Sequence, residues 1–115
     1  MATVKYKLKL DQGATLRKPF TWKAGGEPVD LAEYTGRMQI RETIDAEEVI
    51  AELTSDNGGI IIGPDVGTFT LYMSATETAA LDFDSAVYDV ELQSPNGDVT
   101  RILAGDVTLT REVTR

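Results

Sequence analysis

The sequence predicts an all-β fold, a single antiparallel β-sandwich of about eight strands that spans residues 1–115. Short stretches in which apolar and polar residues alternate recur along the chain, and a period of two is typical of strands with one buried face. Turn sequences rich in Gly, Pro, Asn and Asp separate nearly every pair of these stretches. One short helical pattern, near residues 75–81, interrupts the series.

The strongest of these patterns is a β-hairpin in the C-terminal third of the chain. Its first strand alternates Tyr88, Val90 and Leu92 with polar residues, and the turn that follows has the sequence SPNGD. A second strand returns over residues 99–104, and a last short strand follows after a break at Gly105. We expect this segment to form the hydrophobic centre of the fold.

Two strands are expected in the N-terminal region. Residues 4–10 alternate apolar side chains with three lysines, which is the cleanest amphipathic strand pattern in the chain. Residues 15–23 form the second strand, and Pro19 predicts that it lies at a sheet edge because proline has no N–H to donate to a ladder. The glycines and proline of residues 24–30 predict a loop.

Four more strands are predicted in the middle of the chain, at residues 36–42, 48–54, 60–62 and 68–73. In the second of them, Val49, Ala51 and Leu53 are expected on one side of the strand and Ile50 on the other.

The predicted helix begins with a capping box. Ser74 is the expected N-cap, and Glu77 stands three residues later, where its carboxylate can accept from the Ser74 N–H. Ala80 and Leu81 at the other end are expected to close one end of the core.

The composition excludes most catalytic and metal chemistry. The chain has no cysteine and no histidine, so it lacks thiolate nucleophiles, the commonest general base and the commonest transition-metal ligand. Asp82 and Asp84 form a carboxylate pair, but their loop is too short to supply the oxygens of a calcium site. We therefore expect no enzymatic activity, no metal and no cofactor.

Charge is distributed unevenly along the chain. The net charge is −8, yet residues 1–23 carry six basic residues and one acidic residue, so the rest of the chain carries −13. The acidic total disfavours nucleic-acid binding, and no apolar run is long enough for a membrane helix. Two interpretations fit the basic end: Lys5, Lys7 and Lys9 contact an acidic partner, or they are the solvated face of an edge strand.

The C-terminal segment is basic as well. Arg101, Arg111 and Arg115 lie close together in sequence, and residues 110–115 form a polar end. Either this end is a frayed terminus, or Arg111 and Arg115 belong to an arm that docks on a neighbour.

Three pieces of sequence carry a family resemblance: QGAT at residues 12–15, VDL with YTG at residues 29–36, and YDVEL with VTRIL at residues 88–103. The ending VTLTREVTR, residues 107–115, is close to VTVSPEVTR, the ending of the same family. With these pieces the chain resembles small structural virion proteins of tailed bacteriophages, and the N-terminal domain of siphophage upper baseplate proteins.

The resemblance implies an immunoglobulin-like sandwich that acts by assembly. It implies a structural component of the virion, in the neck or collar or in the tail or baseplate, made in the host cytoplasm. Its partners would be other virion proteins, and it would form a homo-oligomeric ring or decorate one. The alternative is an adhesive or carbohydrate-binding module, for which Trp22, Tyr34 and Tyr72 are the candidate stacking residues.

Overall fold

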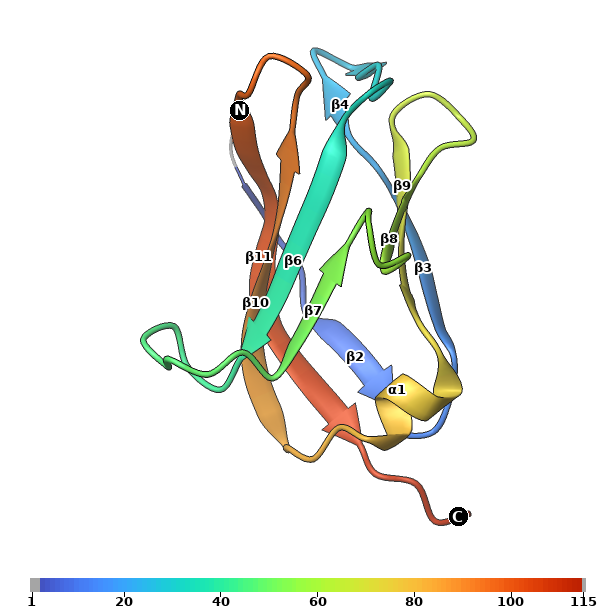
Figure 1. The fold of residues 1–115 in the computed structure, drawn as a ribbon, viewed down its shortest axis with the longest axis vertical. Helices are drawn as coiled ribbons and strands as arrows, with labels where there is room; N and C mark the ends of the chain where they lie inside the picture. Colours follow the sequence, from blue (N-terminus) through green and yellow to red (C-terminus); the bar gives the residue numbers. More distant parts are fainter. Residues whose placement is uncertain (1–2, 115) are drawn as a thin grey trace.

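A computed structural model describes residues 3–114 as two β-sheets packed face to face, which confirms the predicted sandwich (Figure 1). The large sheet has the strand order β1-β11-β10-β6-β7, with β2 also paired to β11, and the small sheet has the order β3-β9-β8. The strands are β1 (Val4–Lys5), β2 (Leu8–Asp11), β3 (Leu16–Thr21), β4 (Lys23–Ala24), β5 (Glu27–Pro28), β6 (Thr35–Arg41), β7 (Ala51–Thr54), β8 (Ile60–Ile62), β9 (Thr68–Met73), β10 (Ser85–Gln93) and β11 (Val99–Thr110). In this part of the chain no helix has the length and apolar character that crossing a bilayer takes.

The predicted hairpin is the centre of the large sheet. Strands β10 and β11 pair antiparallel, and β6 pairs antiparallel with the other side of β10. Val90, Leu92 and Val107 are fully buried, because alternate residues of these strands point at the small sheet. The predicted break at Gly105 was wrong, since β11 runs without interruption through this residue.

The N-terminal edge differs from its prediction. The expected strand at residues 4–10 is divided at Tyr6 and Lys7 into β1 and β2, and both parts pair parallel with β11. At the division, the Tyr6 N–H donates to the Ala104 carbonyl oxygen over 3.0 Å. The Tyr6 carbonyl oxygen accepts from the Tyr88 hydroxyl over 2.8 Å.

A close approach of the backbone at Gly105 makes this arrangement possible. Gly105 lies opposite Tyr88 in the ladder, and a Cβ atom on Gly105 would lie 2.3 Å from the Tyr6 carbonyl oxygen. Only glycine leaves room for that carbonyl. The Tyr88 side chain is buried beside it, and burial first, then the neighbouring Tyr6, raises the pKa of the Tyr88 hydroxyl to about 12.

The small sheet follows its prediction closely. Strand β3 lies at an edge and pairs antiparallel with β9, so Pro19 occupies an edge strand as expected. Phe69, Leu71 and Met73 of β9 are buried on the face toward the large sheet.

Two predictions for the connecting segments were wrong. Strand β7 begins at Ala51 rather than at residue 48, so Val49 and Ile50 lie before the strand, and Val49 is 39% exposed. Residues 24–30 are not all loop, because β4 and β5 form a small antiparallel pair there.

The helix α1 (Ala75–Ala79) has the predicted capping box. The Glu77 N–H donates to the Ser74 hydroxyl over 3.1 Å, and the Ser74 N–H donates to the Glu77 carboxylate over 2.9 Å. Leu81 is buried as predicted, whereas Ala80 is exposed and Thr78 takes the inward position. The Thr78 hydroxyl donates to the Ala14 carbonyl oxygen over 2.8 Å and so ties the helix to the turn before β3.

Candidate functional site

The predicted interface residues do not gather into one site. Lys5 and Lys9 lie on β1 and β2 with Lys7 between them, and all three are exposed. Arg111 instead binds its own chain: its Nη1 donates to the Asp82 carboxylate over 2.6 Å and its Nε to Asp84 over 3.4 Å. The hydrogen bond and charge of Asp82 are the main reasons why the pKa of Arg111 is raised. Arg115 lies outside the described residues.

The pair Asp82 and Asp84 is thereby explained without a metal. Both carboxylates face one guanidinium, and this ion pair joins the C-terminal end to the segment that follows α1. The interface role of Arg111 stays a prediction; in the folded chain its guanidinium already binds these two carboxylates.

An apolar groove lies between the two sheets, where the edge strands β1 and β3 face each other. It has a volume of about 300 Å³. Its lining is mostly apolar and comes from β1, β3, β9 and β11 with their neighbours: Val4, Tyr6, Lys18, Pro19, Phe20, Thr21, Trp22, Phe69, Ile102 and Leu103. Val4 is 58% exposed at its rim, so water contacts apolar surface here. Strands β1 and β3 each end a sheet on this side, so an added strand could pair with part of either edge, although Pro19 of β3 has no N–H to donate.

Aromatic rings form the floor of this groove. The Tyr6 ring meets the Phe20 ring edge-on at a centroid distance of 5.2 Å, and Phe20 stacks on Phe69 at 5.5 Å. Trp22 meets Tyr34 edge-on at 6.3 Å. These contacts hold the rings in fixed positions, so the groove is formed in advance of any ligand.

One cation lines the groove. The Lys18 ammonium lies 5.7 Å from the centre of the Tyr6 ring and lines the groove itself. Lys5, the neighbour of Val4 on β1, lies instead on the outer face of the large sheet, because successive residues of a strand point to opposite faces. Within residues 3–114 Lys18 makes no ion pair, since the ion pairs found there all use arginines. The groove therefore combines a mostly apolar floor with one lysine that is available to an acidic ligand.

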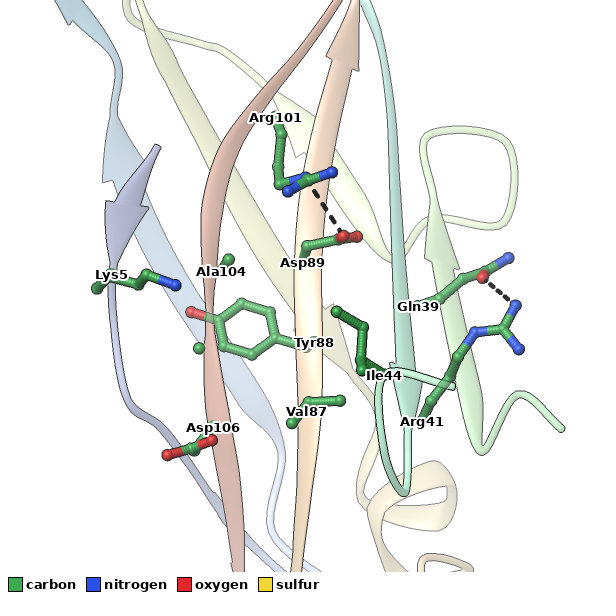
Figure 2. Close-up of a pocket in the computed structure, with 11 residues that line it drawn as sticks. Lys5, Gln39, Arg41, Ile44, Val87, Tyr88, Asp89, Arg101, Ala104 and Asp106 are labelled. Carbon is green, nitrogen blue, oxygen red and sulfur yellow. Dashed lines mark hydrogen bonds and ion pairs between the residues drawn. The ribbon is translucent and has the colours of Figure 1, made fainter. Parts of the chain in front are cut away.

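A second hollow, of about 320 Å³, lies on the outer face of the large sheet (Figure 2). Some of its polar groups bind one another: Arg101 pairs with Asp89 over 3.5 Å, and Arg41 donates to Gln39 over 2.8 Å. Lys5 and Asp106 also line it. Ile44, from the loop between β6 and β7, lies at its margin and is 85% exposed.

The aromatic residues proposed for carbohydrate stacking do not form one platform. Tyr72 lies on β9 with the Arg17 guanidinium 5.1 Å from its ring centre, so one face of this ring is covered. Trp22 and Tyr34 pack against each other beside the groove instead.

No family model and no curated protein matches this chain. Among solved structures, the chain is similar to CopC from Methylosinus trichosporium OB3b, with a TM-score of 0.50 and 15% sequence identity. The alignment covers 94% of this chain and 89% of that protein. At this identity the likeness shows a shared β-sandwich fold and carries no activity across.

This comparison corrects the predicted function. The solved structure that the chain resembles is CopC and not a phage virion protein, so the comparison contradicts the predicted role as a tailed-phage virion component, and that prediction was wrong. No comparison tests the sequence resemblance itself, which stays a prediction.

The residues of this chain do not fit a copper site. The chain has no histidine and no cysteine, and imidazole and thiolate are the ligands that copper favours in proteins. Met38 and Met73 are buried in the core. Residues 3–114 contain no group of three or more carboxylates that could hold a metal ion.

Sequence reasoning missed the groove because its lining is assembled from distant segments. Val4 and Phe20 were assigned to strands, but nothing in the sequence shows that β1 and β3 leave a gap between the sheets. The one available signal was the basic N-terminal region, which contains Lys18.

Proposed function

We propose that this chain is a non-catalytic binding module that holds an extended, acidic and apolar segment of a partner protein in the groove between β1 and β3. The observation that carries this proposal is the combination at one place of two strand edges, a mostly apolar aromatic floor and Lys18, which makes no ion pair within residues 3–114. An extended segment can hydrogen-bond to a free strand edge and place alternate side chains in the groove.

The pattern of the ligand follows from this geometry. Side chains of one parity face the groove and are apolar, because they replace water against Val4 and Phe20. The segment also carries acidic side chains, because the Lys18 ammonium at the groove makes no ion pair within residues 3–114. The lack of histidine and cysteine supports a binding role rather than a catalytic one.

Two synthetic peptides test this proposal, one alternating Val and Glu and one alternating Val and Lys. Trp22 is the only tryptophan of the chain and lines the groove, so its fluorescence reports binding there. We expect the Val–Glu peptide to change the Trp22 emission and the Val–Lys peptide to leave it unchanged.

Lys18→Glu is expected to weaken Val–Glu binding about fivefold, in line with the loss of an exposed ion pair and the gain of a repulsion. Lys9→Glu is the matched control, because Lys9 is an exposed lysine on β2 that does not line the groove. The proposal fails if neither peptide changes the emission, or if Lys9→Glu weakens binding as much as Lys18→Glu does.

A further inference from the structure

The loop between β6 and β7, residues 42–50, carries negative charge, whereas the groove carries the positive charge of Lys18. The loop also has exposed apolar side chains. We name it the acidic loop; its sequence is ETIDAEEVI. Ile44, Val49 and Ile50 are exposed large apolar residues. Its four acidic residues, Glu42, Asp45, Glu47 and Glu48, are also exposed. None of these four makes an ion pair within residues 3–114. The acidic loop thus has the ligand chemistry that the groove requires.

The acidic loop is held in one shape by Arg41. The Nη1 of Arg41 donates to the carbonyl oxygens of Ala46, over 2.7 Å, and Glu47, over 3.0 Å. Its Nη2 donates to the Gln39 side chain over 2.8 Å, which fixes the guanidinium on β6. A loop that is already ordered loses little conformational entropy when it binds, so its exposed Ile44 can serve as a binding anchor.

The same contacts keep the loop away from the groove of its own chain. Arg41 holds it against the outer face of the large sheet, and Ile44 lies beside the hollow on that face (Figure 2). The groove opens elsewhere, between the edges of β1 and β3. In Figure 1 the loop projects sideways from the large sheet, where another molecule can reach it.

We infer that the acidic loop of one copy binds in the groove of a second copy, so that the chain associates with itself head to tail. This inference rests on the proposed function of the groove and names its partner. Because the loop is bent rather than extended, its contacts with the groove are made by side chains and not by pairing with a strand edge. Ile44 packs against the apolar floor, and the loop carboxylates face Lys18. The two surfaces are different, so the contact is heterologous and can extend from copy to copy.

Two variants of the intact protein test the inference, each of which disables one surface. Ile44→Ser removes the anchor of the loop, and Lys18→Glu reverses the charge in the groove. Each variant alone is expected to weaken self-association about tenfold or more, as measured by sedimentation equilibrium at low salt. Val4→Glu is a second groove variant at an exposed position, in case Lys18→Glu impairs folding.

Mixing the two variants gives the decisive result. The loop of the Lys18→Glu chain is intact, and so is the groove of the Ile44→Ser chain, so the mixture is expected to form one-to-one heterodimers that do not grow further. A symmetric contact between identical patches would not be restored in this way. The inference is overturned if the wild-type chain stays monomeric at high concentration, or if the mixture stays monomeric while the wild type associates.

The peptide experiment separates the two proposals. If the Val–Glu peptide binds at the groove but the wild-type chain stays monomeric, the self-association is wrong and the binding function stands. If the chain associates but the peptide has no effect on Trp22 and Lys18→Glu has no effect on association, both the function of the groove and its assigned partner are wrong.

Discussion

The two sides of the sandwich, where the edges of its sheets meet, are built in opposite ways. On the side of β7 and β8, Leu53 and Ile60 are buried between the sheets. Glycines allow this close fit, since a Cβ atom on Gly59 would lie 2.6 Å from the Leu53 Cβ, and one on Gly36 would lie 2.9 Å from Ile60. On the side of β1 and β3, the sheets leave the groove, with Val4 exposed at its rim.

This difference separates stability from binding. The closed side removes apolar surface from water and so stabilises the fold. The open side keeps apolar surface in water next to Lys18, and this surface contributes little to folding and is available for a partner. Substitutions on the two sides should therefore have different effects, and four predictions follow in order of expected size.

The largest effect is expected on the closed side. Leu53→Ala should lower the free energy of unfolding by about 3 kcal/mol, because it leaves a cavity at a fully packed position. Urea denaturation measures this change. Val49→Ala, in the exposed loop just before β7, is the control and should lower the free energy of unfolding by less than about 0.5 kcal/mol. Equal costs for both variants would show that the closed side is not packed as described.

The next effect concerns the strand that borders the groove. Gly105→Ala should cost about 2 kcal/mol, because the new methyl group would collide with the Tyr6 backbone and push β1 away from β11. Amide hydrogen exchange at Tyr6, whose N–H donates to Ala104, should become faster. Thr110→Ala at the exposed end of β11 is the control. Unchanged exchange at Tyr6 would contradict the close approach.

A smaller effect on stability is expected from the Tyr88 hydroxyl, which donates to the Tyr6 carbonyl oxygen. Tyr88→Phe should cost about 1 kcal/mol at neutral pH, because the hydrogen bond to Tyr6 is lost. Denaturation of both proteins at neutral pH measures the difference.

The pH dependence of this difference gives a further check. The pKa of Tyr88 is raised from 10.0 to about 12 in the folded chain, so the unfolded chain loses the proton first. The stabilisation is complete below pH 10 and is lost as the pH rises toward about 12. The wild type should therefore lose its advantage over Tyr88→Phe in this window, and parallel stability curves would contradict the buried hydroxyl.

The smallest effect on stability is expected at the rim of the groove. Val4→Ser should change the free energy of unfolding by less than about 0.5 kcal/mol, because Val4 is mostly exposed. It should nevertheless weaken binding of the Val–Glu peptide several-fold, as read from Trp22 emission. A large loss of stability without loss of binding would reverse the roles of the two sides.

Local patterns in the sequence were enough to predict the parts of the fold that depend on near neighbours. The capping box of Ser74 and Glu77 and the alternation of Tyr88, Val90 and Leu92 are such patterns, and both were confirmed. The division of the N-terminal strand was missed because it depends on Gly105, which is distant in sequence and admits the Tyr6 carbonyl.

Other features of the structure were missed for the same reason. The strand was expected to begin at residue 48, but the side chain of Arg41 holds the acidic loop in another shape, and β7 begins at Ala51. The ion pairs of Arg111 with Asp82 and Asp84 join segments that are about thirty residues apart, as the 29 and 27 residues of separation show. The groove depends on the spacing between two sheets, which no local pattern reports.

The division of the N-terminal edge into β1 and β2 also limits how neighbouring molecules can join. A long straight edge is a template on which strands add without end, as in amyloid fibrils. Here β1 offers only two residues before the backbone steps inward at Tyr6, so a guest strand that follows this edge soon loses its ladder. Contacts between side chains, rather than backbone hydrogen bonds along the β1 edge, must then determine which molecule binds there.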